Sequence, residues 1–319
     1  MQKKVLITGA SGFVGYHLIA QAIASGYTVV AAVRRSSAVD HLKAFNITYT
    51  HLNYADVDAL RSDIVTQGYD YIIHASGTTK AKTLDDYNLV NAEYSRNLAM
   101  ASIGTQVKKF VFVSSLAAIG PLTDVHGHIS ANQQPMPVTS YGVSKLQAEA
   151  YLKAIDGLPL LVIRPTAVYG PREKDIFILF NSINKGLEPY IGKFEQQLSF
   201  VYVKDLAAVI LQALASTLTH QSYNISDGHG YDRYALALHA KNILSKRTFK
   251  FHIPLFIVRI MASLLDALYA KSKATPALNK EKLAELTAVN WVCDIEKARM
   301  EIGYAPKYNL EEGLTETMK

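Results

Sequence analysis

The sequence VLITGASGFVG, residues 5–15, decides the fold that the rest of the chain is expected to adopt. An apolar run of strand type leads into Gly9, Gly12 and Gly15, and a stretch with helical spacing begins among these glycines. Glycines let the backbone turn tightly and approach a pyrophosphate, which then meets the amide groups at the start of the helix. A glycine triplet alone is a weak signal, but its place between a strand and a helix predicts a dinucleotide-binding turn.

Working outward, short apolar runs alternate with helical periods through the first half of the chain. We expect further strands in TVVAAVR, YDYIIHASG, KKFVFVSS and PLLVIRPT, with helices over residues 12–25, over residues 84–103 and from about Tyr141. Strand and helix repeated in this order predict a parallel sheet with helices on both faces, because parallel strands need crossover connections. The fold class is therefore α/β, a Rossmann-type doubly wound parallel sheet followed by a smaller C-terminal substrate-binding lobe.

The same rhythm sets the expected domains. Residues 1–165 form the NAD(P)-binding domain, and residues 166–319 form mainly the substrate-binding lobe, with a segment near 200–216 returning to the first domain. RPTAVYGPRE and GKFEQQLS are interpreted as loops, and residues 203–215 and 232–244 as helices.

Composition narrows the class of protein. Of the 319 residues, 49% are hydrophobic and 19% charged, and the single Cys293 excludes a disulfide framework or a cysteine metal site. A strand that begins within four residues of Met1 leaves no room for a signal peptide, so we expect a cytoplasmic protein. The net charge of +6 is spread without a basic run, which argues against nucleic acid as a partner.

The apolar segment PLFIVRIMASLLDALYA, residues 254–270, raises the question of a membrane. It is shorter than the ~20 apolar residues of a spanning helix and contains Arg259 and Asp266, so we expect no membrane span. We interpret the segment as a core or lid helix, with a surface helix that meets a lipid or an apolar substrate as the alternative.

The second strand indicates the type of dinucleotide. NAD-binding enzymes usually end this strand with an acidic residue that binds the ribose hydroxyls, whereas here Arg34 and Arg35 follow it. Guanidinium groups suit a 2′-phosphate, so NADP (NADPH) is favoured over NAD. Asp40 stands too far along to replace the missing acid, and the alternative is that both arginines face only solvent.

TSYGVSK, residues 139–145, places a tyrosine four residues ahead of a lysine on one helix face. A nearby ammonium favours phenolate, so Lys145 is expected to lower the pKa of Tyr141 and let the phenol exchange a proton. Ser114 and Ser115 end the preceding strand, at the edge of the sheet where such folds bind ligands.

These motifs together resemble the extended short-chain dehydrogenases/reductases, a group that includes sugar-nucleotide epimerases, dihydroflavonol reductases and 3β-hydroxysteroid dehydrogenases. The resemblance covers nearly the whole chain and includes RPTAVYGPR and FVYVKDLA. It implies catalytic roles for Ser115, Tyr141 and Lys145, with Asn91 in a proton relay and hydride transfer to or from nicotinamide C4. The cofactor-binding residues implied are Thr8, Gly9, Ser11, Gly12, Phe13, Val14, Gly15, Arg34, Arg35, Asn53, His74, Ala75, Ser76, Tyr141, Lys145, Arg164 and Pro165.

Two departures separate the branches of this group. Sugar-nucleotide enzymes commonly carry an asparagine where this chain has Ala167 and an arginine where it has Leu198, and both contact the substrate diphosphate. Other basic residues such as Lys193, Arg247 or Arg259 could replace these contacts. We therefore favour a reductase or dehydrogenase of a small or apolar alcohol or ketone, with a sugar-nucleotide epimerase or dehydratase as the alternative.

Three further expectations complete the prediction. A non-catalytic dinucleotide sensor is disfavoured because the serine, tyrosine and lysine are all present, and His126 and His128 lack partner ligands for a metal. The resemblance implies a homodimer through the helices near residues 84–103 and 141–155. The substrate itself is not specified by the sequence.

Overall fold

The computed structural model describes residues 2–269, 272, 276 and 278–318. Its centre is a parallel sheet of seven strands in the order β11-β6-β5-β4-β1-β2-β3. This order reverses direction beside β1, which is the switch point at which doubly wound sheets bind ligands. The strands are β1 (Lys4–Thr8), β2 (Thr28–Ala32), β3 (Thr48–Thr50), β4 (Tyr71–His74), β5 (Lys109–Val113), β6 (Leu160–Pro165) and β11 (Gln221–Ile225).

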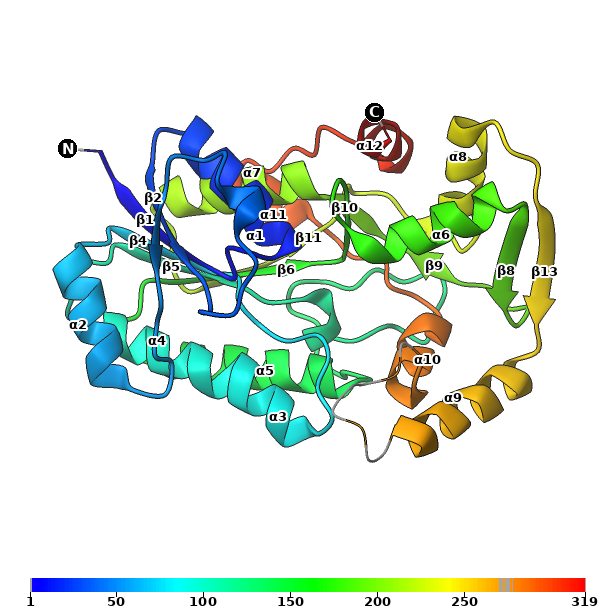
Figure 1. Cartoon of the computed structure of the whole chain (residues 1–319), viewed down its shortest axis with the longest axis horizontal. Coiled ribbons are helices and arrows are strands. Elements are labelled where there is room, and N and C mark those ends of the chain that lie inside the picture. Colours follow the sequence, from blue (N-terminus) through cyan, green and yellow to red (C-terminus); the bar gives the residue numbers. More distant parts are fainter. Residues whose placement is uncertain (1, 270–271, 273–275, 277, 319) are drawn as a thin grey trace.

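Helices cover both faces of the sheet, as Figure 1 shows. One face carries α1 (Phe13–Ala24), α7 (Val203–Ala215) and α11 (Glu296–Ile302), and the other carries α2 (Val57–Gln67), α4 (Tyr94–Ser102) and α5 (Ser140–Lys153). Within β1, Val5 and Ile7 pack toward α1 and α7, whereas Leu6 packs toward α2, α4 and α5. The strands are apolar on both sides because each face of the sheet is buried under helices.

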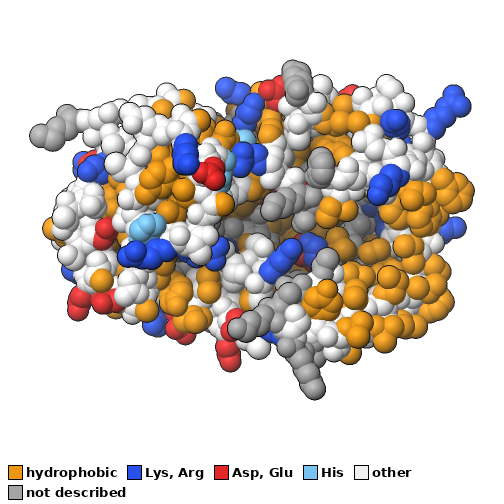
Figure 2. Space-filling model, in the orientation of Figure 1, with side chains coloured by type: hydrophobic (Ala, Val, Ile, Leu, Met, Phe, Trp, Pro, Cys, Tyr) orange, Lys and Arg blue, Asp and Glu red, His pale blue; other side chains and the backbone are white. Residues whose placement is uncertain are grey.

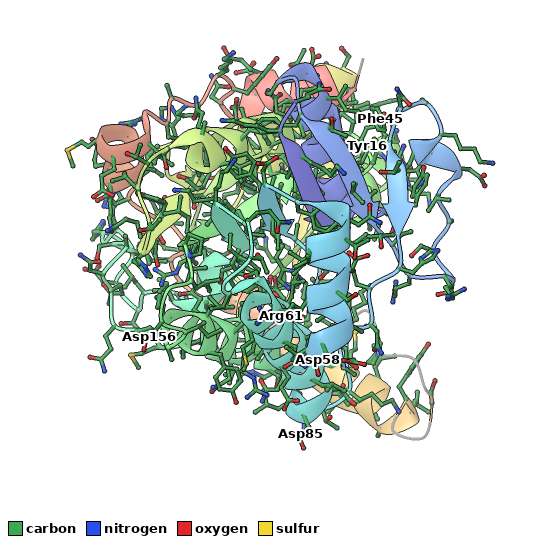
Figure 3. All side chains as sticks on the ribbon, turned by 90° about the vertical axis from the view of Figure 1, so that its left-hand side faces the viewer. Tyr16, Phe45, Asp58, Arg61, Asp85 and Asp156 are labelled. Atoms are coloured by element: carbon green, nitrogen blue, oxygen red, sulfur yellow. The ribbon has the colours of Figure 1, made fainter. Side chains whose placement is uncertain are left out.

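The sheet edge near β2 is closed by side-chain contacts (Figure 3). Tyr16 of α1 and Phe45, which follows the short turn η1 (Asp40–Leu42), have ring centroids 5.1 Å apart. Arg61 of α2 donates hydrogen bonds to the carbonyls of Met100 and Ile103 at the end of α4. The first contact joins α1 to the segment after η1, and the second joins α2 to the end of α4 on the other face of the sheet.

The helix predicted over residues 84–103 is interrupted in the structure. It consists of α3 (Leu84–Asn88), a π-helical turn η2 (Leu89–Glu93) and α4, and it ends at Ser102. Single π-helical turns inside helices occur frequently at functional sites. Asn91, the proposed relay residue, lies in this turn.

The remaining elements form the C-terminal lobe and its connections to the sheet. Short strand pairs join β7 (Ala167–Tyr169) with β10 (Phe200–Tyr202), β9 (Gln197–Leu198) with β12 (Tyr231–Asp232), and β8 (Leu187–Ile191) with β13 (Phe249–Ile253). The described helices of this part are α6 (Lys174–Asn184), α8 (Ala235–Leu244), α9 (Leu255–Tyr269), α10 (Lys280–Thr287) and α12 (Leu310–Thr317), besides a short turn η3 (Leu116–Ala118) earlier in the chain.

The lobe differs from the sequence prediction in detail. The two segments predicted as loops contain β7 and β9, because each pairs with a strand that is distant in sequence. The helix predicted over residues 232–244 begins only at Ala235, since Asp232 belongs to β12. The chain returns to the sheet in α7, which packs on α1, and in β11, which pairs with β6.

The apolar segment 254–270 forms α9, but it is not a core helix. Val258 and Ala262 are its buried residues, whereas Phe256, Ile260 and Leu264 are exposed. Of the predicted alternatives, the core helix is therefore wrong for most of this surface, whereas the lid helix and the surface helix stay predictions. Ala270 lies outside the described residues. Within the ranges that the structure describes, no helix combines the length and hydropathy needed to cross a membrane.

Candidate active site

A cleft of about 990 Å³ opens at the carboxyl ends of β1, β2 and β4. The predicted cofactor residues that line it are Gly9, Ser11, Gly12, Arg34, Arg35, Asn53, Ala75 and Ser76. Four segments that are separated in sequence thus meet at the switch point of the sheet, as the motif predicts.

The glycine turn has the geometry that a close ligand requires. Gly9 has φ +67°, and a Cβ there would lie 2.5 Å from the carbonyl oxygen of Ala75. A Cβ on Gly15 would collide with the carbonyl of Gly9, so this glycine lets α1 pack on the turn. The first amides of α1, at Phe13 and Val14, have no acceptor within the helix and provide an anion-binding end beside the cleft.

Thr8 and His74 support the turn from below and do not line the cleft. The Thr8 hydroxyl lies 2.8 Å from Nδ1 of His74 and accepts a hydrogen bond from the Ser76 amide, and Nε2 of His74 lies 2.9 Å from the Ser95 hydroxyl. Burial and the charge of Lys145 lower the pKa of His74 to about 3. A neutral imidazole therefore ties β1 to β4 and to the helix that carries Asn91.

Arg34 and Arg35 are exposed side chains at the end of β2, within the cleft. Asp40 does not line the cleft, and its carboxylate is 2.7 Å from the ammonium of Lys43. Among the described lining residues the one carboxylate is Asp86 of α3, which accepts hydrogen bonds from Thr83 at the start of that helix. The end of the cleft beside β2 is consequently basic.

Tyr141 and Lys145 lie in the first turns of α5, whose N-terminus is capped by the Thr139 hydroxyl accepting from the Gly142 amide. Lys145 Nζ donates to the Val113 carbonyl at 2.7 Å and lies 4.3 Å from the centre of the Phe112 ring. Burial lowers the pKa of Lys145 to about 7, against a smaller opposing effect of Glu149. Neither residue lines the cleft, although Lys145 Nζ lies close to Gly77, which does.

The pKa of Tyr141 shifts opposite to the prediction. Burial raises it to about 12, a hydrogen bond with Ser115 acts to lower it, and the charge of Glu285 raises it further. Lys145 is not among the groups that lower it, because its ammonium is directed to Val113. The phenol is therefore protonated at neutral pH in this arrangement and can act as a proton donor.

The two serines at the end of β5 have different partners. Ser114 is buried, and its hydroxyl donates to Glu149 Oε1 at 2.7 Å. Ser115 accepts from the Ala117 amide and forms the hydrogen bond with Tyr141. Of the two serines, Ser115 is therefore the one whose hydroxyl lies beside the phenol of Tyr141.

Asn91 is fully buried and acts on the backbone of the cleft wall. Its Oδ1 accepts from the Thr78 amide at 2.7 Å, and its Nδ2 donates to the Thr78 carbonyl at 3.0 Å and to the Ser144 hydroxyl at 2.9 Å. The Ser144 hydroxyl in turn donates to the Tyr141 carbonyl. Asn91 therefore connects the segment beside the cleft to the first turns of α5.

Arg164, which the resemblance implies as a cofactor-binding residue, contacts a buried carboxylate instead. Its guanidinium binds both carboxylate oxygens of Glu149, at 2.8 and 2.5 Å, and the carbonyl of Ala131. Although burial favours the neutral acid, Arg164 outweighs it and holds the pKa of Glu149 below its usual value. Neither Arg164 nor Pro165 lines the cleft. Arg164 is directed to Glu149 because a buried carboxylate requires a charged partner.

The sequence interpretation missed one wall of the cleft. Gly77 follows β4, and the wall continues along the chain and onto the facing helix. The missed lining residues include Ser37, Tyr54, Gly77, Thr78, Thr79, Lys80, Ala81, Leu89, Val90 and Tyr94. The segment from Gly77 to Ala81 directly follows His74, Ala75 and Ser76 in the sequence, and this nearness was the available signal. No residue type in this stretch marks a ligand contact by itself.

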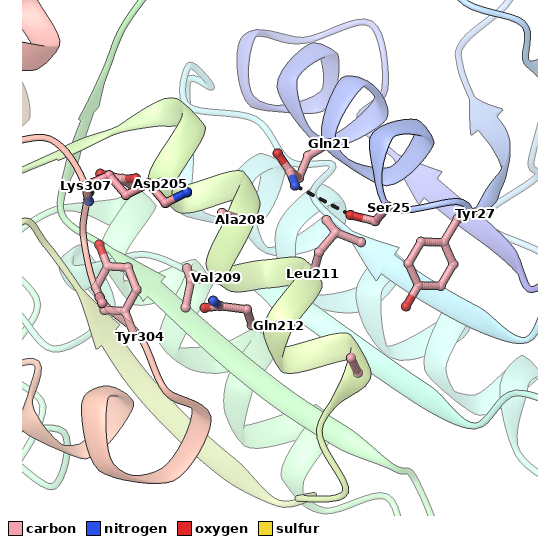
Figure 4. A pocket seen from close by; sticks show the side chains of 12 residues that line it. Gln21, Ser25, Tyr27, Asp205, Ala208, Val209, Leu211, Gln212, Tyr304 and Lys307 are labelled. Carbon is pink, nitrogen blue, oxygen red and sulfur yellow. Dashed lines mark hydrogen bonds between the residues drawn. The ribbon is translucent and has the colours of Figure 1, made fainter.

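A second cavity, of about 450 Å³, shares no lining residue with the cleft. Figure 4 shows it between α1 and α7, where Gln21 and Ser25 face Leu211, with Tyr304 and Lys307 at the opposite end. Throughout the described part of the chain, no group of three or more His, Cys, Asp or Glu side chains is placed to hold a metal ion.

Known proteins resemble this chain in sequence and in fold. Residues 5–226 match the NAD dependent epimerase/dehydratase family. The chain is 27% identical to a UDP-glucose 4-epimerase of Vibrio cholerae over 99% of this chain and 95% of that protein. It is 26% identical to a ceramide reductase of Caulobacter vibrioides (strain NA1000 / CB15N) over 98% of this chain and 93% of that protein. The crystal structure of a UDP-glucose 4-epimerase from Thermotoga maritima has the same fold, with TM-score 0.80, 24% identity and coverage of 98% and 97%.

Proposed function

The chain belongs to the NAD dependent epimerase/dehydratase family, and within it we propose a reductase that prefers NADPH and acts on a ketone, or on the corresponding secondary alcohol in reverse. The observation that carries the preference is the basic end of the cleft at Arg34 and Arg35. Two guanidinium groups can meet a 2′-phosphate, whereas the acid that would bind ribose hydroxyls is absent from the end of β2. Asp40, paired with Lys43, does not replace it.

The residues around Tyr141 support reduction. When bound, the nicotinamide supplies or accepts the hydride. Ser115 donates a hydrogen bond to the ketone oxygen, and Tyr141 gives its proton to that oxygen as it becomes an alcohol. A pKa of about 12 keeps the phenol protonated at neutral pH, which is the form this step requires.

Lys145 serves the same site from beneath the cleft. Its ammonium holds the end of β5 through Val113 and lies close to Gly77, where Asn91 also reaches the cleft wall. We assign it the binding of the nicotinamide ribose, for which its ammonium provides hydrogen-bond donors. Asn91 positions Thr78 for the nucleotide and the start of α5 for the substrate.

An apolar substrate is supported by what replaces the diphosphate contacts. Ala167 is exposed and carries no hydrogen-bonding group, and Leu198 packs with the apolar cluster around Tyr169 and Phe200. Arg247 lies beside Gly186 at the start of β8, at the end of the lobe remote from the sheet (Figure 1). The Caulobacter relative named for ceramide reduction fits a substrate with a large apolar part.

The second candidate is a sugar-nucleotide epimerase that retains its own NAD. The similarity to the Vibrio UDP-glucose 4-epimerase over almost the full length favours it. It requires a diphosphate site built from residues other than Ala167 and Leu198.

We also propose a homodimer through α4 and α5, which lie next to each other on one face of the sheet (Figure 1).

The test begins with the nucleotide released from the purified protein on denaturation, identified by mass spectrometry, followed by titration of NADPH and NADH. We expect NADPH to bind more tightly, and the R34Q/R35Q double variant to lose roughly ten- to a hundredfold in affinity for NADPH but little for NADH. Lys80→Gln, which lines the cleft away from β2, is the matched control.

Retained NAD⁺, or equal affinity for both nucleotides in the starting protein, would contradict the NADPH preference. Turnover is then assayed with UDP-glucose and with apolar ketones in parallel. Conversion of UDP-glucose without consumption of added nucleotide would replace the reductase with the epimerase.

A further inference from the structure

The outer face of α9 is an exposed apolar surface with a regular pattern. Its apolar residues recur at i, i+1, i+4, i+5, i+8 and i+12, which places them on one side of the helix. They are Phe256, Ile257, Ile260, Met261, Leu264 and Leu268. Phe256 is 63% exposed, Leu264 58% and Leu268 76%.

The opposite side of α9 explains how the helix is held. Val258 and Ala262 are buried against Leu283 of α10, with Ile191 and Ile253 of the β8–β13 pair beside them. The helix is thus anchored by its inner side. The outer apolar side makes no contribution to the protein interior.

The apolar surface continues onto the outer face of the β8–β13 pair. Leu187 and Phe249 stand opposite each other in the strand register and are 44% and 70% exposed, and Phe251 stacks on Phe249 with centroids 6.0 Å apart. In Figure 2 hydrophobic side chains gather over this end of the molecule, whereas acidic ones lie mainly over the other half. We call α9 together with Leu187 and Phe249 the apolar end; contiguous exposed patches of this kind mark interaction sites.

The charged side chains around the apolar end are mainly basic. Between Asp232 and Asp266 the chain has no acidic residue. It has six Lys and Arg residues there: Arg233, Lys241, Lys246, Arg247, Lys250 and Arg259. Their summed charge equals the net charge of +6 of the whole chain. Lys241 is paired with Glu188, and Arg233 binds the carbonyls of Ile191 and Phe194. In the part of the chain that the structure describes, the other four have no acidic partner, and all four are exposed.

We propose that the apolar end docks the protein on an anionic lipid bilayer surface, with α9 lying in the interface. Apolar side chains on one helix face beside uncompensated Lys and Arg residues are the two features that interfacial helices combine. The helix has 15 residues and charged side chains at Arg259 and Asp266, which suits lying on a membrane.

The charge distinguishes this occupant from a second copy of the chain. A two-fold contact through the apolar end would bring each basic group near its equivalents in the other copy, because such interfaces are self-complementary. Anionic headgroups instead neutralise these groups. The surface also lies next to the catalytic helix: α10 packs on α9, and Glu281 of α10 binds the backbone amide of Ser140 at 3.2 Å.

The test is flotation of the full chain, without substrate, on vesicles of phosphatidylcholine alone and of equimolar phosphatidylcholine and phosphatidylglycerol. We expect binding to the anionic vesicles that weakens with added salt. The F256S/L264S variant should lose roughly tenfold or more in partitioning, and the K246Q/R247Q variant about twentyfold on anionic vesicles. Both pairs are exposed, so folding and NADPH binding should not change.

Matched controls are the V65S/M300S double variant and Lys3→Gln, which alter exposed apolar and basic side chains outside the apolar end. Absence of flotation in the starting protein, or equal flotation of the test and control variants, would overturn the proposal. So would sedimentation showing an oligomer that F256S/L264S converts to a smaller species. Because the readout is binding without substrate, failure of the proposed reductase activity leaves this test unaffected.

Discussion

Tyr141 and Lys145 share one face of α5, yet their surroundings shift their pKa values in opposite directions. Burial disfavours the charged form of each, so the pKa of the phenol rises to about 12 and that of the ammonium falls to about 7. The phenol is protonated at neutral pH and the lysine is close to its own midpoint. A tyrosine four residues before a lysine is readable from the sequence, but the sign of the shift depends on how both side chains are buried.

Replacing Tyr141 with Phe removes the proton donor while keeping the ring. We expect kcat to fall by roughly 10²- to 10⁴-fold with the Kd for NADPH unchanged, measured by steady-state turnover and fluorescence titration. Tyr87→Phe is the matched control, since its ring centroid is 6.4 Å from that of Tyr141 and its hydroxyl bonds to backbone groups at Thr79 and Ala81. Near-normal turnover of Tyr141→Phe would remove the tyrosine from the mechanism.

Lys145 should make stability rise with pH. Its pKa is about 7 when folded and near the ordinary 10.5 when unfolded, so between these values the unfolded chain binds a proton that the folded protein has released. The free energy of unfolding therefore increases with pH across this window and levels off above it. Urea unfolding at several pH values should show a smaller slope for Lys145→Met, while the exposed Lys80→Met keeps the slope of the starting protein. Equal slopes would show that the folded pKa is not lowered.

At the scale of elements, the π-helical turn η2 is a feature that the sequence pattern does not predict. Residues 84–103 have helical spacing throughout, and the structure inserts the turn where Asn91 must reach Thr78 and Ser144. The hydrogen bonds of a buried amide to the cleft wall favour this local geometry. The strands β7 and β9 show the same limit, because each needs a partner strand from elsewhere in the chain.

Asn91→Ala should therefore destabilise the protein and loosen the cleft. It removes the three hydrogen bonds that the buried amide makes with the Thr78 backbone and the Ser144 hydroxyl, which we expect to cost about 3 kcal/mol and to weaken NADPH binding several-fold. Denaturant unfolding and nucleotide titration measure the two effects. Asn97→Ala in α4 loses one hydrogen bond, to the Tyr54 carbonyl, and should cost about 1 kcal/mol. If the two variants were equally stable, the hydrogen bonds of Asn91 to Thr78 and Ser144 would not stabilise the fold as proposed.

At the scale of the whole molecule, the C-terminal lobe meets the sheet domain at the start of α5. Glu281 of α10 accepts hydrogen bonds from the amide and hydroxyl of Ser140, one residue before Tyr141, and Glu285 of the same helix raises the pKa of the tyrosine. No residue of α10 lines the cleft at the carboxyl ends of the strands. Substrate binding and cofactor binding are therefore expected to respond separately to changes in α10.

Glu281→Ala should raise the KM of the substrate several-fold while the Kd for NADPH stays constant, because α10 is released from the start of α5 but the lining of the cleft is untouched. The apolar ketone identified in the substrate panel serves for the kinetics. Glu296→Ala, which removes an exposed pair with Arg299 in α11, is the control. An unchanged KM, or a loss of NADPH affinity, would contradict this division of roles.

The sequence by itself determined the features that depend on neighbouring residues. The strand, glycine turn and helix of residues 5–24, the arginines after β2 and the Tyr141–Lys145 spacing are local, and the structure places all of them around one edge of the sheet. Their positions follow from the periodicity of strands and helices and from backbone freedom at Gly9.

Only the tertiary structure decided the features that depend on distant partners. Arg164 binds Glu149 because both are buried together, and His74 becomes a neutral tie between Thr8 and Ser95 for the same reason. The apolar face of α9 is exposed because Val258 and Ala262 already use the inner side of that helix. Composition predicts that such residues prefer burial, but only the packing of the other elements determines which of them are buried.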